Sequence, residues 1–517
     1  MNQRKITLQH FVPSMADILF LTIFLFLSIS GSKMLLGDGD TGYHIRAGEY
    51  ILKTFSVPHS DIFSYLTPAL PWTAHEWLSE IVMALIHRAT GLSGVAIFFA
   101  AIIASVYFLL FKIVRSYKGN ILVSLFIMLL VILSSQIHWL ARPHIFSLLI
   151  IVLWYYLLDL YEYSDRNYLY LMPPLMLLWV NLHGGFIIGL VLNGIYLIGN
   201  VIRTFSSAGE EKVYYRQKIR TLLLITVACF FVTVINPHGY HILLFPFRLT
   251  SNKFIMDHII EFISPNFHDP MLFFKYFLLF MIITFAISKK RLNIIEHMLT
   301  VLFTYMSLYS VRYIPLFSII MAIILVKQTD SVVDQSDSKI MAFIKRRAER
   351  IDSVDVAARG HLWLFAAVLL AAIGLMNGKL VHRFNEETMP VAAVEFLQKE
   401  HIPGNMFNND EFGDYIIYAA WPEYKVFFDG RSDMYGAERI KEYYKLTNIE
   451  PGWQDILKKY DINWVIYNDK STLSQFLLQR DDWRLIYADK VANIFIKNKP
   501  ENLVLIEKYR NIKLDDN

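Results

Sequence analysis

Long apolar segments recur along most of this chain, and they constrain its fold more than any other feature. About eleven predominantly apolar stretches alternate with polar loops, at 15–36, 93–112, 120–137, 145–160, 169–182, 185–202, 221–236, 271–288, 293–310, 313–327 and 361–378. A helix needs about 20 apolar residues to cross a bilayer, and inside the hydrocarbon it satisfies its own backbone polar groups. The sequence therefore predicts a mainly α polytopic membrane protein with about 11 transmembrane helices.

The composition agrees with a chain that is partly dissolved in lipid. Of the 517 residues, 55% are hydrophobic and only 18% are charged, whereas about a quarter of an ordinary soluble protein is charged. The net charge is +4 and the basic residues lie in short loops, so the chain lacks the basic patch of a nucleic-acid-binding protein. The single cysteine, Cys229, excludes an intramolecular disulfide and a thiolate-based metal site.

Charged loops predict the orientation of these helices. Lys- and Arg-rich short loops stay on the cytoplasmic side, and here every second loop is basic, at Arg4 and Lys5, 112–118, 203–220, 289–291 and 327–359. The first apolar run is too long for a cleaved signal, so we expect a retained anchor and a cytoplasmic N-terminus. We interpret the short apolar segment Trp77–Arg88 as an interfacial helix at the outer surface.

With an odd number of spans, everything after about residue 380 lies outside, so we expect a multi-pass protein of the cytoplasmic (inner) membrane with a periplasmic or extracellular C-terminal domain. Residues 1–379 form the membrane domain, including the first outer loop, 37–92, and residues 380–517 form a soluble α/β domain. Periodicity predicts helices and strands in that domain. The helices are expected at 390–399 and 437–446, and the strands at 405–408, 425–429, 464–467, 483–488 and 491–497.

Two carboxylates follow the first span directly, in the run Gly37-Asp38-Gly39-Asp40. Carboxylates at the mouth of a helix bundle can act as a general base or hold a hard divalent cation such as Mg²⁺ or Mn²⁺. A solvated Gly/Asp turn explains the same residues without chemistry, and the sequence leaves both interpretations open.

Further polar side chains gather at the predicted outer ends of the spans, where charge is costly and marks pathways or catalysis. They are His44, His75, Glu76, His138, Arg142, His144, His183, Asp257, Glu261 and Arg312. The guanidinium groups of Arg142 and Arg312 suit a phosphate, or they reach toward lipid headgroups. Each histidine could ligate a metal, polarise a substrate or simply be a hydrogen-bonded interfacial aromatic.

The first outer loop resembles that of GT-C glycosyltransferases. The run D-x-x-Y-x-x-x-x-x-E-Y-I-L from Asp40 is followed by P-x-x-D and by P-W-x-x-H-E-W-L, which ends at Leu78. The tail, with Asn408-Asn409-Asp410-x-x-Gly413-Asp414-Tyr415 and Phe428-Asp429-Gly430-Arg431-Ser432-Asp433, is similar to a set of bacterial multi-spanning proteins with an extracytoplasmic C-terminal domain. The resemblance covers most of the chain.

This resemblance implies a membrane glycosyltransferase that uses a polyprenyl-phosphate-linked sugar at the outer face and inverts the anomeric centre. It places the base or acceptor-orienting role on Asp40, with support from Asp38, His44, His75 and Glu76. The donor phosphate would meet Arg142 or Arg312, and His138, His144, His183, Asp257 and Glu261 are further candidates for the cleft.

The chain departs from the family pattern in three ways. Asp40 is followed by Thr41 instead of a second acid, a Lys-Pro-Pro-Leu stretch is replaced around His75, and the tail lacks a Trp-Trp-Asp motif. The acceptor is therefore undetermined, and the partners we expect are a polyprenyl-linked donor and membrane lipids. A divalent cation, if bound, would use Asp38 and Asp40. The alternatives are a non-catalytic envelope assembly scaffold and a transporter of a lipid-linked sugar or an ion.

Overall fold

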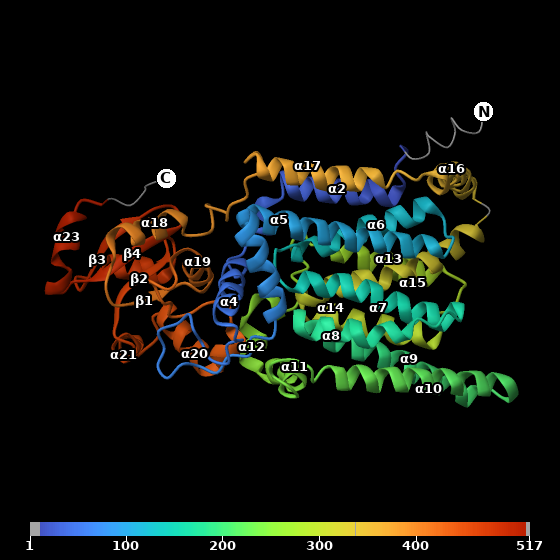
Figure 1. Ribbon diagram of the computed structural model, residues 1–517, viewed down its shortest axis with the longest axis horizontal. Coiled ribbons are helices and arrows are strands. Elements are labelled where there is room, and N and C mark those ends of the chain that lie inside the picture. The colour runs from blue at the N-terminus through green and yellow to red at the C-terminus, as the bar shows by residue number, and fades with distance from the viewer. Residues whose placement is uncertain (1–10, 337, 513–517) are drawn as a thin grey trace.

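The computed structural model describes residues 11–336 and 338–512; Arg4 and Lys5, which contribute to the loop-charge pattern, lie outside these residues. The molecule is elongated. A bundle of roughly parallel helices forms one part, and a small domain with a sheet lies at one end of the bundle (Figure 1). We call this end, which the loop charges predict to face outward, the outer end.

Each of the eleven predicted apolar stretches overlaps a helix of the bundle. These helices are α2 (Met15–Ile29), α5 (Trp77–Ser116), α6 (Ile121–Ser135), α7 (His144–Ser164), α8 (Met172–Leu182), α9 (Ile187–Ser206), α10 (Gly209–Val232), α13 (Phe274–Ile287), α14 (Ile294–Tyr309), α15 (Ile314–Asp334) and α17 (Leu362–Met376). Polar side chains cap several of them. Ser14 and Asp17 form a capping box at the start of α2, and Asn293 and Glu296 form another at the start of α14.

Five helical segments are long and apolar enough to cross a membrane, and a bent pair would make a sixth. The five are Trp77–Ser116, Ile121–His138, His144–Ser164, Gly184–Ser206 and Val311–Asp334. Four further apolar helices have between 10 and 17 residues, which is shorter than a perpendicular span requires. The described residues thus form a multi-pass membrane protein, while the count of about 11 spans stays a prediction.

The expected interfacial helix Trp77–Arg88 is the first part of α5. Gly91 interrupts this helix with φ 68° and ψ −168°, so a first segment before the glycine joins the apolar segment after it at a bend. A left-handed φ is accessible to glycine without the steric cost that a side chain would meet. The first segment can therefore take its own direction at the end of the span.

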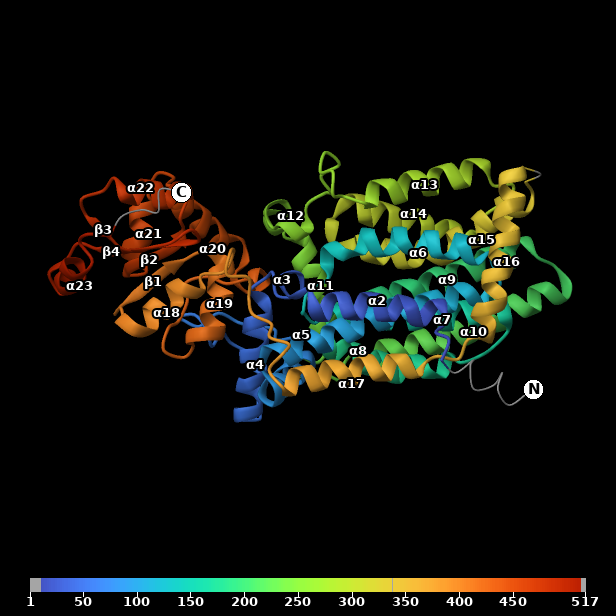
Figure 2. The ribbon, with the colours of Figure 1, turned by 90° about the horizontal axis from the view of Figure 1, so that it is seen from above.

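Short helices cover the outer end of the bundle. They are α3 (Ser32–Leu35), α4 (Asp40–Thr54), α11 (His241–Ser251), α12 (Lys253–His258) and the 3₁₀ turns η1 (Gln136–His138), η3 (Gly184–Phe186), η4 (Ile260–Phe262) and η5 (Val311–Tyr313). At the opposite end lie the turn η2 (Leu169–Leu171) and the helix α16 (Lys339–Ala357), which runs across the direction of the bundle (Figure 2).

The C-terminal domain contains a four-stranded sheet in the order β1-β2-β4-β3. Strands β1 (Asn405–Asn408) and β2 (Ile462–Asn468) are parallel, and β4 (Ala492–Lys497) pairs antiparallel with β2 and with β3 (Trp483–Ala488). The helices are α18 (Val391–Glu400), α19 (Asp410–Ala420), α20 (Ser432–Thr447), α21 (Trp453–Lys459), α22 (Thr472–Leu478) and α23 (Leu503–Lys508), with the turn η6 (Pro500–Asn502). This arrangement confirms the α/β class of the domain.

The strand predicted at 425–429 is wrong. This segment joins no strand of the sheet and makes only an isolated bridge, in which Val426 pairs with Ser64 of the first outer loop. The amide of Val426 donates to the carbonyl of Phe63 at 3.1 Å. An extended apolar segment has the same local pattern whether it pairs with a sheet or with a loop, so periodicity could not separate the two. Helices α19, α21, α22 and α23 were not predicted either.

A buried ion pair joins the first outer loop to the C-terminal domain. The guanidinium of Arg431 donates to Asp61 of the loop at 2.8 Å and to Asp429 at 2.7 Å, and it stacks on Trp72 with its carbon 4.6 Å from the ring centroid. Tyr435 also donates to Asp429, at 2.8 Å. The first outer loop therefore packs as part of the C-terminal half of the molecule, although the chain places it directly after the first helix.

We predict that Arg431→Met destabilises this docking. Removing the cation leaves Asp61 and Asp429 buried without their partner, which costs about 3–5 kcal/mol, and we expect a clearly lower apparent melting temperature in detergent. Arg439→Met is the control, because Arg439 is partly exposed and pairs with Glu442 within one helix, an arrangement worth less than about 1 kcal/mol. Equal melting temperatures for the two variants would contradict the prediction.

Candidate active site

A cavity of about 420 Å³ lies at the outer end of the bundle, between the bundle and the C-terminal domain. Its polar lining from the membrane domain includes Asp38, Asp40, Tyr43, His75, Glu76, His138, Arg142, His144, His183, Glu261 and Arg312. The C-terminal domain adds Asp410, Glu411, Asp414, Asp429 and Asp433. The cavity continues along apolar side chains of α7, α9, α11 and α15, among them Leu148, Ile151, Ile188, Leu249 and Leu316. It is thus acidic at one end and apolar at the other.

The first turn of α4 places Asp40 in this cavity. The Asp38 carboxylate accepts a hydrogen bond from the backbone amide of Asp40 at 2.6 Å, which satisfies a free amide at the start of the helix. Asp40 is buried, with 7% of its surface exposed. The Gly/Asp run is therefore a structured helix start at which Asp40 faces the cleft, rather than a solvated turn.

Arg142 gathers three carboxylates from different segments. It donates to Asp38 at 2.7 Å and to Glu261 at 2.7 Å, and it pairs with Asp40. Burial acts to raise the pKa of Glu261, but Arg142 and Arg312 outweigh it and hold that pKa well below its usual range. Because carboxylates occupy its donors, Arg142 acts in this arrangement as the group that holds Asp40 in position.

Arg312 is less engaged than Arg142. It donates to Glu261 at 3.1 Å, its guanidinium carbon lies 5.2 Å from the ring centroid of Phe262, and 34% of its side chain is exposed. It lines the cavity, and Glu261 is its one carboxylate partner among the described residues. Arg312 is therefore the cation of the site with donors left for an anionic ligand.

Asp414 of α19 is a site residue that the sequence analysis missed. It accepts a hydrogen bond from the amide of Gly430 at 3.0 Å, and its carboxyl group lies on the same side of Gly430 as that of Asp40. Burial raises the pKa of both carboxyl groups. For Asp40 the charges of Asp38 and Glu261 add to the rise and Arg142 opposes it, and for Asp414 the charges of Asp40 and Asp429 add to it. Arg142 pairs with Asp40 and not with Asp414, so of the two carboxyl groups Asp40 is the one whose charged form has a cationic partner.

Two glycines permit this close approach of the two halves. A β-carbon on Gly430 would lie 2.3 Å from Oδ1 of Asp40 and 2.9 Å from Oδ2 of Asp414. A β-carbon on Gly42 of α4 would lie 2.6 Å from Cβ of Tyr418 in α19. A larger residue at either position would have to push the carboxyl pair or the two helices apart.

Three of the predicted histidines surround Glu76. Nε2 of His44, His75 and His183 lies 3.6, 3.8 and 3.5 Å from the Glu76 carboxylate. His44 is itself buried behind the cavity wall and contacts Glu80 at 3.2 Å. Burial raises the pKa of Glu76, and the histidine and arginine charges only partly oppose this.

Of the remaining predicted residues, two lie at the cavity wall and one lies outside the cavity. Nε2 of His138 contacts the carbonyl of Val311 at 3.3 Å, and Nε2 of His144 contacts the carbonyl of His138 at 2.8 Å, so both rings are hydrogen-bonded to backbone at the cavity wall. Asp257 is exposed on α12 and does not belong to the residues that line the cavity. The structure thus brings together every predicted candidate except Asp257. His44 does not line the cavity but lies behind Glu76.

The carboxylates do not form a ready-made metal site. Within residues 11–336 and 338–512, no group of three or more His, Cys, Asp or Glu side chains has the geometry to hold a metal ion. Asp38 and Asp40, the expected ligands, both pair with Arg142, which occupies the space a cation would need. The residues in this arrangement therefore do not fit a divalent cation, and we derive no chemical step through one.

Several acids of the C-terminal domain stand in the motifs that carry the resemblance of the tail, but no local pattern assigned them a role in the site. Asp410, Glu411 and Asp414 lie in one short run, and Asp433 follows Arg431 closely. Burial and the neighbouring charges of Asp410 and Asp38 raise the pKa of Glu411 to about 7. The local pattern marks an acidic helix start, but it does not show that this helix faces Asp40.

We predict that Gly42→Ala lowers the stability of the site. The added carbon would also lie 3.0 Å from the carbonyl oxygen of Asp414, so α4 and α19 must separate, at a cost of about 1–3 kcal/mol. The control is Gly194→Ala in α9, where nothing lies within 4 Å of the added carbon. The apparent melting temperature in detergent should fall for the first variant only, and equal values would show that the close approach is not required.

No protein-family model matches the sequence, and no curated protein matches it. Among solved structures, the oligosaccharyltransferase of Archaeoglobus fulgidus in the apo form has a TM-score of 0.54 and 10% identity, over 94% of this chain and 74% of its own. ArnT from Cupriavidus metallidurans bound to undecaprenyl phosphate has a TM-score of 0.49 and 14% identity, over 92% of this chain and 97% of its own. The similarity to the oligosaccharyltransferase shows that this chain shares its fold with that protein.

Proposed function

We propose that this protein is a membrane glycosyltransferase that transfers a sugar from a polyprenyl phosphate to an acceptor hydroxyl at the outer face of the membrane, with inversion at the anomeric carbon. The observation that carries the proposal is the cavity itself, which joins an apolar surface inside the bundle to Asp40 and Arg312 at its polar end. A lipid-linked sugar has the same division into an apolar chain and a polar head. The GT-C fold, shared with an oligosaccharyltransferase, supports this reaction class.

The donor lies along the length of the cavity. The isoprenoid chain contacts the apolar side chains of α7, α9, α11 and α15 that line the cavity inside the bundle. Arg312 binds the phosphate, since its guanidinium offers a planar set of donors and retains free ones beside Glu261. The sugar then lies between Arg312 and the acidic wall of the C-terminal domain.

Asp40 acts on the acceptor. The acceptor oxygen attacks the anomeric carbon from the face opposite the lipid phosphate, the carbon–oxygen bond to the phosphate breaks, and the lipid phosphate leaves with the electron pair. The acceptor proton passes to the Asp40 carboxylate, which Arg142 and Asp414 hold in place. Arg312 stabilises the charge that develops on the leaving phosphate, where a fixed cation in a partly dry cleft contributes most.

The first experiment is turnover of synthetic short-chain polyprenyl phosphates that carry a hexose, an N-acetylhexosamine or a pentose. The purified protein in nanodiscs should release free polyprenyl phosphate from one of these donors, measured by mass spectrometry, with water or an added glycan as acceptor. Loss of a general base lowers such rates by about 10²–10⁴-fold, so we expect Asp40→Asn to reduce release by at least about 100-fold.

The control for this experiment is Asp257→Asn, an exposed position outside the cavity, which should keep the full rate. If no donor is bound or consumed, or if Asp40→Asn and Asp257→Asn release polyprenyl phosphate equally fast, the glycosyltransferase proposal is wrong. A scaffold or transport role would then account for the site better.

Asp414 gives a second, independent test of the carboxyl pair. If Asp414 is protonated, the amide of Asp414→Asn can still donate a hydrogen bond to Asp40. This variant should therefore retain turnover within about 10-fold of the unaltered protein, in contrast to Asp40→Asn. Asp414→Ala removes this hydrogen-bond donor and should lower turnover further than Asp414→Asn does. The rates are measured with the same donor at one pH, and a loss in Asp414→Asn as large as in Asp40→Asn would instead identify Asp414 as the ionised base.

A further inference from the structure

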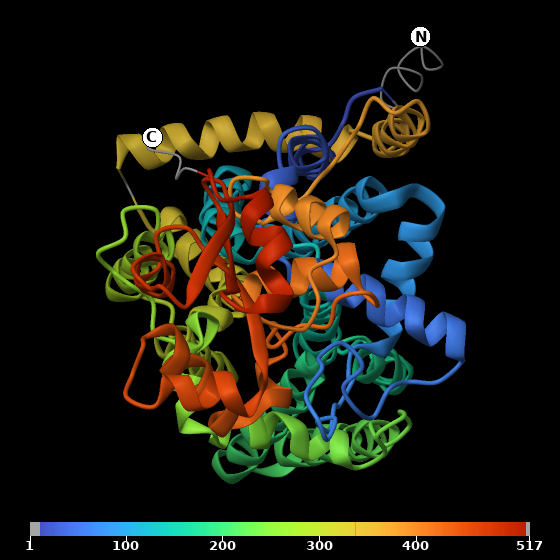
Figure 3. The ribbon, with the colours of Figure 1, turned by 90° about the vertical axis from the view of Figure 1, so that its left-hand side faces the viewer.

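The helix α16 lies at the end of the bundle opposite the C-terminal domain, the end that the loop charges predict to be cytoplasmic. It is bent by 70° relative to α17, and it runs along one edge of the bundle, tangent to its perimeter (Figure 3, gold). A helix in this position lies across the spans and at their ends, where the headgroups of the inner leaflet would lie.

The acidic side chains of α16 that have partners face the bundle. Asp352 pairs with Arg115 at the end of α5, and the Asp355 carboxylate accepts a hydrogen bond from the backbone amide of Met15 at 2.6 Å. Ala348, between them in helical projection, is the one buried residue of the helix. These contacts fix which face of α16 points away from the protein.

The outward face is basic and apolar. Lys339, Phe343, Arg346 and Arg350 recur at helical spacing, and Arg347 lies beside them with its guanidinium carbon 5.1 Å from the ring centroid of Phe343. Phe343 is 52% exposed. Among the described residues, Arg346, Arg347 and Arg350 pair with no carboxylate. The face therefore presents several cations and an aromatic ring with no acid among them.

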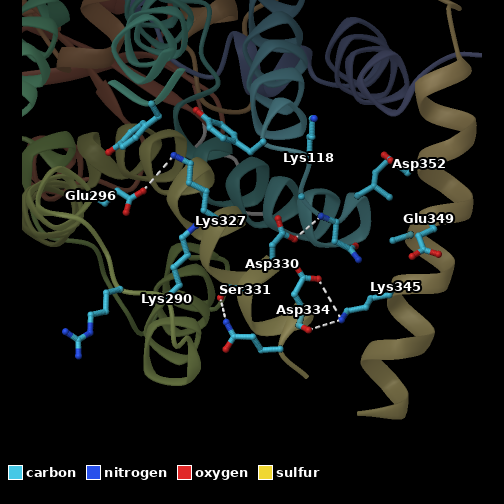
Figure 4. A pocket seen from close by; sticks show the side chains of 18 of the residues that line it. Lys118, Lys290, Glu296, Lys327, Asp330, Ser331, Asp334, Lys345, Glu349 and Asp352 are labelled. Atoms are coloured by element: carbon cyan, nitrogen blue, oxygen red, sulfur yellow. Dashed lines mark hydrogen bonds and ion pairs between the residues drawn. The ribbon is translucent and has the colours of Figure 1, made fainter. Parts of the chain in front are cut away.

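The neighbouring cavity does not share this character. It lies between α16 and the ends of α6, α7, α14 and α15, and its volume is about 1050 Å³ (Figure 4). Five cations and five carboxylates line it, and pairs such as Lys327 with Glu296 and Lys345 with Asp334 cross it. Since these charges balance, the cavity has no preference for an anion. The excess of positive charge lies instead on the outward face of α16.

We propose that the outward face of α16 binds the surface of the inner leaflet through anionic phospholipid headgroups. Cations beside an exposed aromatic ring on a helix parallel to the membrane are the arrangement that adsorbs to acidic bilayers, because the ring enters the acyl boundary while the guanidinium groups contact phosphates. This role is separate from the glycosyltransferase proposal and uses none of its residues.

Fluorescence of a label on α16 tests the proposal. Cys229 is the only cysteine and is buried, so Ser353→Cys, at an exposed position on the outward side of α16, can be labelled selectively with an environment-sensitive nitrobenzoxadiazole dye in the full-length protein. In nanodiscs of phosphatidylcholine with about a third phosphatidylglycerol, we expect emission at least about twofold brighter than in pure phosphatidylcholine.

A charge variant completes the test. Replacing Arg346, Arg347 and Arg350 by Gln in the labelled protein should abolish the difference between the two lipids. The matched control replaces Lys458, Lys459 and Lys490 by Gln, three exposed lysines of the C-terminal domain, and should keep the difference. Equal emission in both lipids, or a difference that survives the arginine replacements, overturns the proposal whether or not the protein transfers sugar.

Discussion

The site depends on the interaction of Arg142 with Asp38, Asp40 and Glu261. These groups come from the start of the first outer loop, the turn before α7 and the turn η4, which the chain separates by more than a hundred residues. One partly buried cation among three carboxylates, of which Asp40 is buried, leaves a net negative charge that is costly away from water unless further partners share it. Arg312 pairs with Glu261, and Asp414 of the C-terminal domain lies beside Asp40, so groups from both halves of the molecule complete the cluster.

This requirement explains why the C-terminal domain belongs to the site rather than to the periphery. Arg431 fixes the domain to the first outer loop through Asp61, and the same loop starts with Asp40. The glycines at 42 and 430 let α19 and the turn after Phe428 come within contact of α4. A domain joined by a flexible linker alone could not hold Asp414 against Asp40, because the two carboxyl groups must keep their relative position to a fraction of an ångström.

The two ends of the bundle have opposite chemistry. The outer end carries an acidic cavity that opens onto an apolar surface, while the other end carries a helix with arginines directed outward. Carboxylates suit hydrogen bonds from sugar hydroxyls, and guanidinium groups suit lipid phosphates. The charged groups of the chain are thus distributed unequally between the two ends of the bundle.

Many of the helices and several residues of the candidate site could be predicted from the sequence. Apolar length and helical periodicity located the eleven helices, and the first outer loop identified Asp40, because these features depend on residues close together in the chain. Arg142, Glu261 and Arg312 were found since helix ends on one side of a membrane must lie near one another.

Only the tertiary structure decided which of these groups touch. The contacts of Asp40 with Asp414, of Asp61 with Arg431 and of Ser64 with Val426 each join residues more than 350 positions apart. No local pattern encodes such a contact, since its energy arises only when both segments leave water together. For that reason the sequence determined the helices and the candidate base, while the neighbour of Asp40 in α19 and the ion pairs of Arg142 came from the packing of segments that lie far apart in the chain.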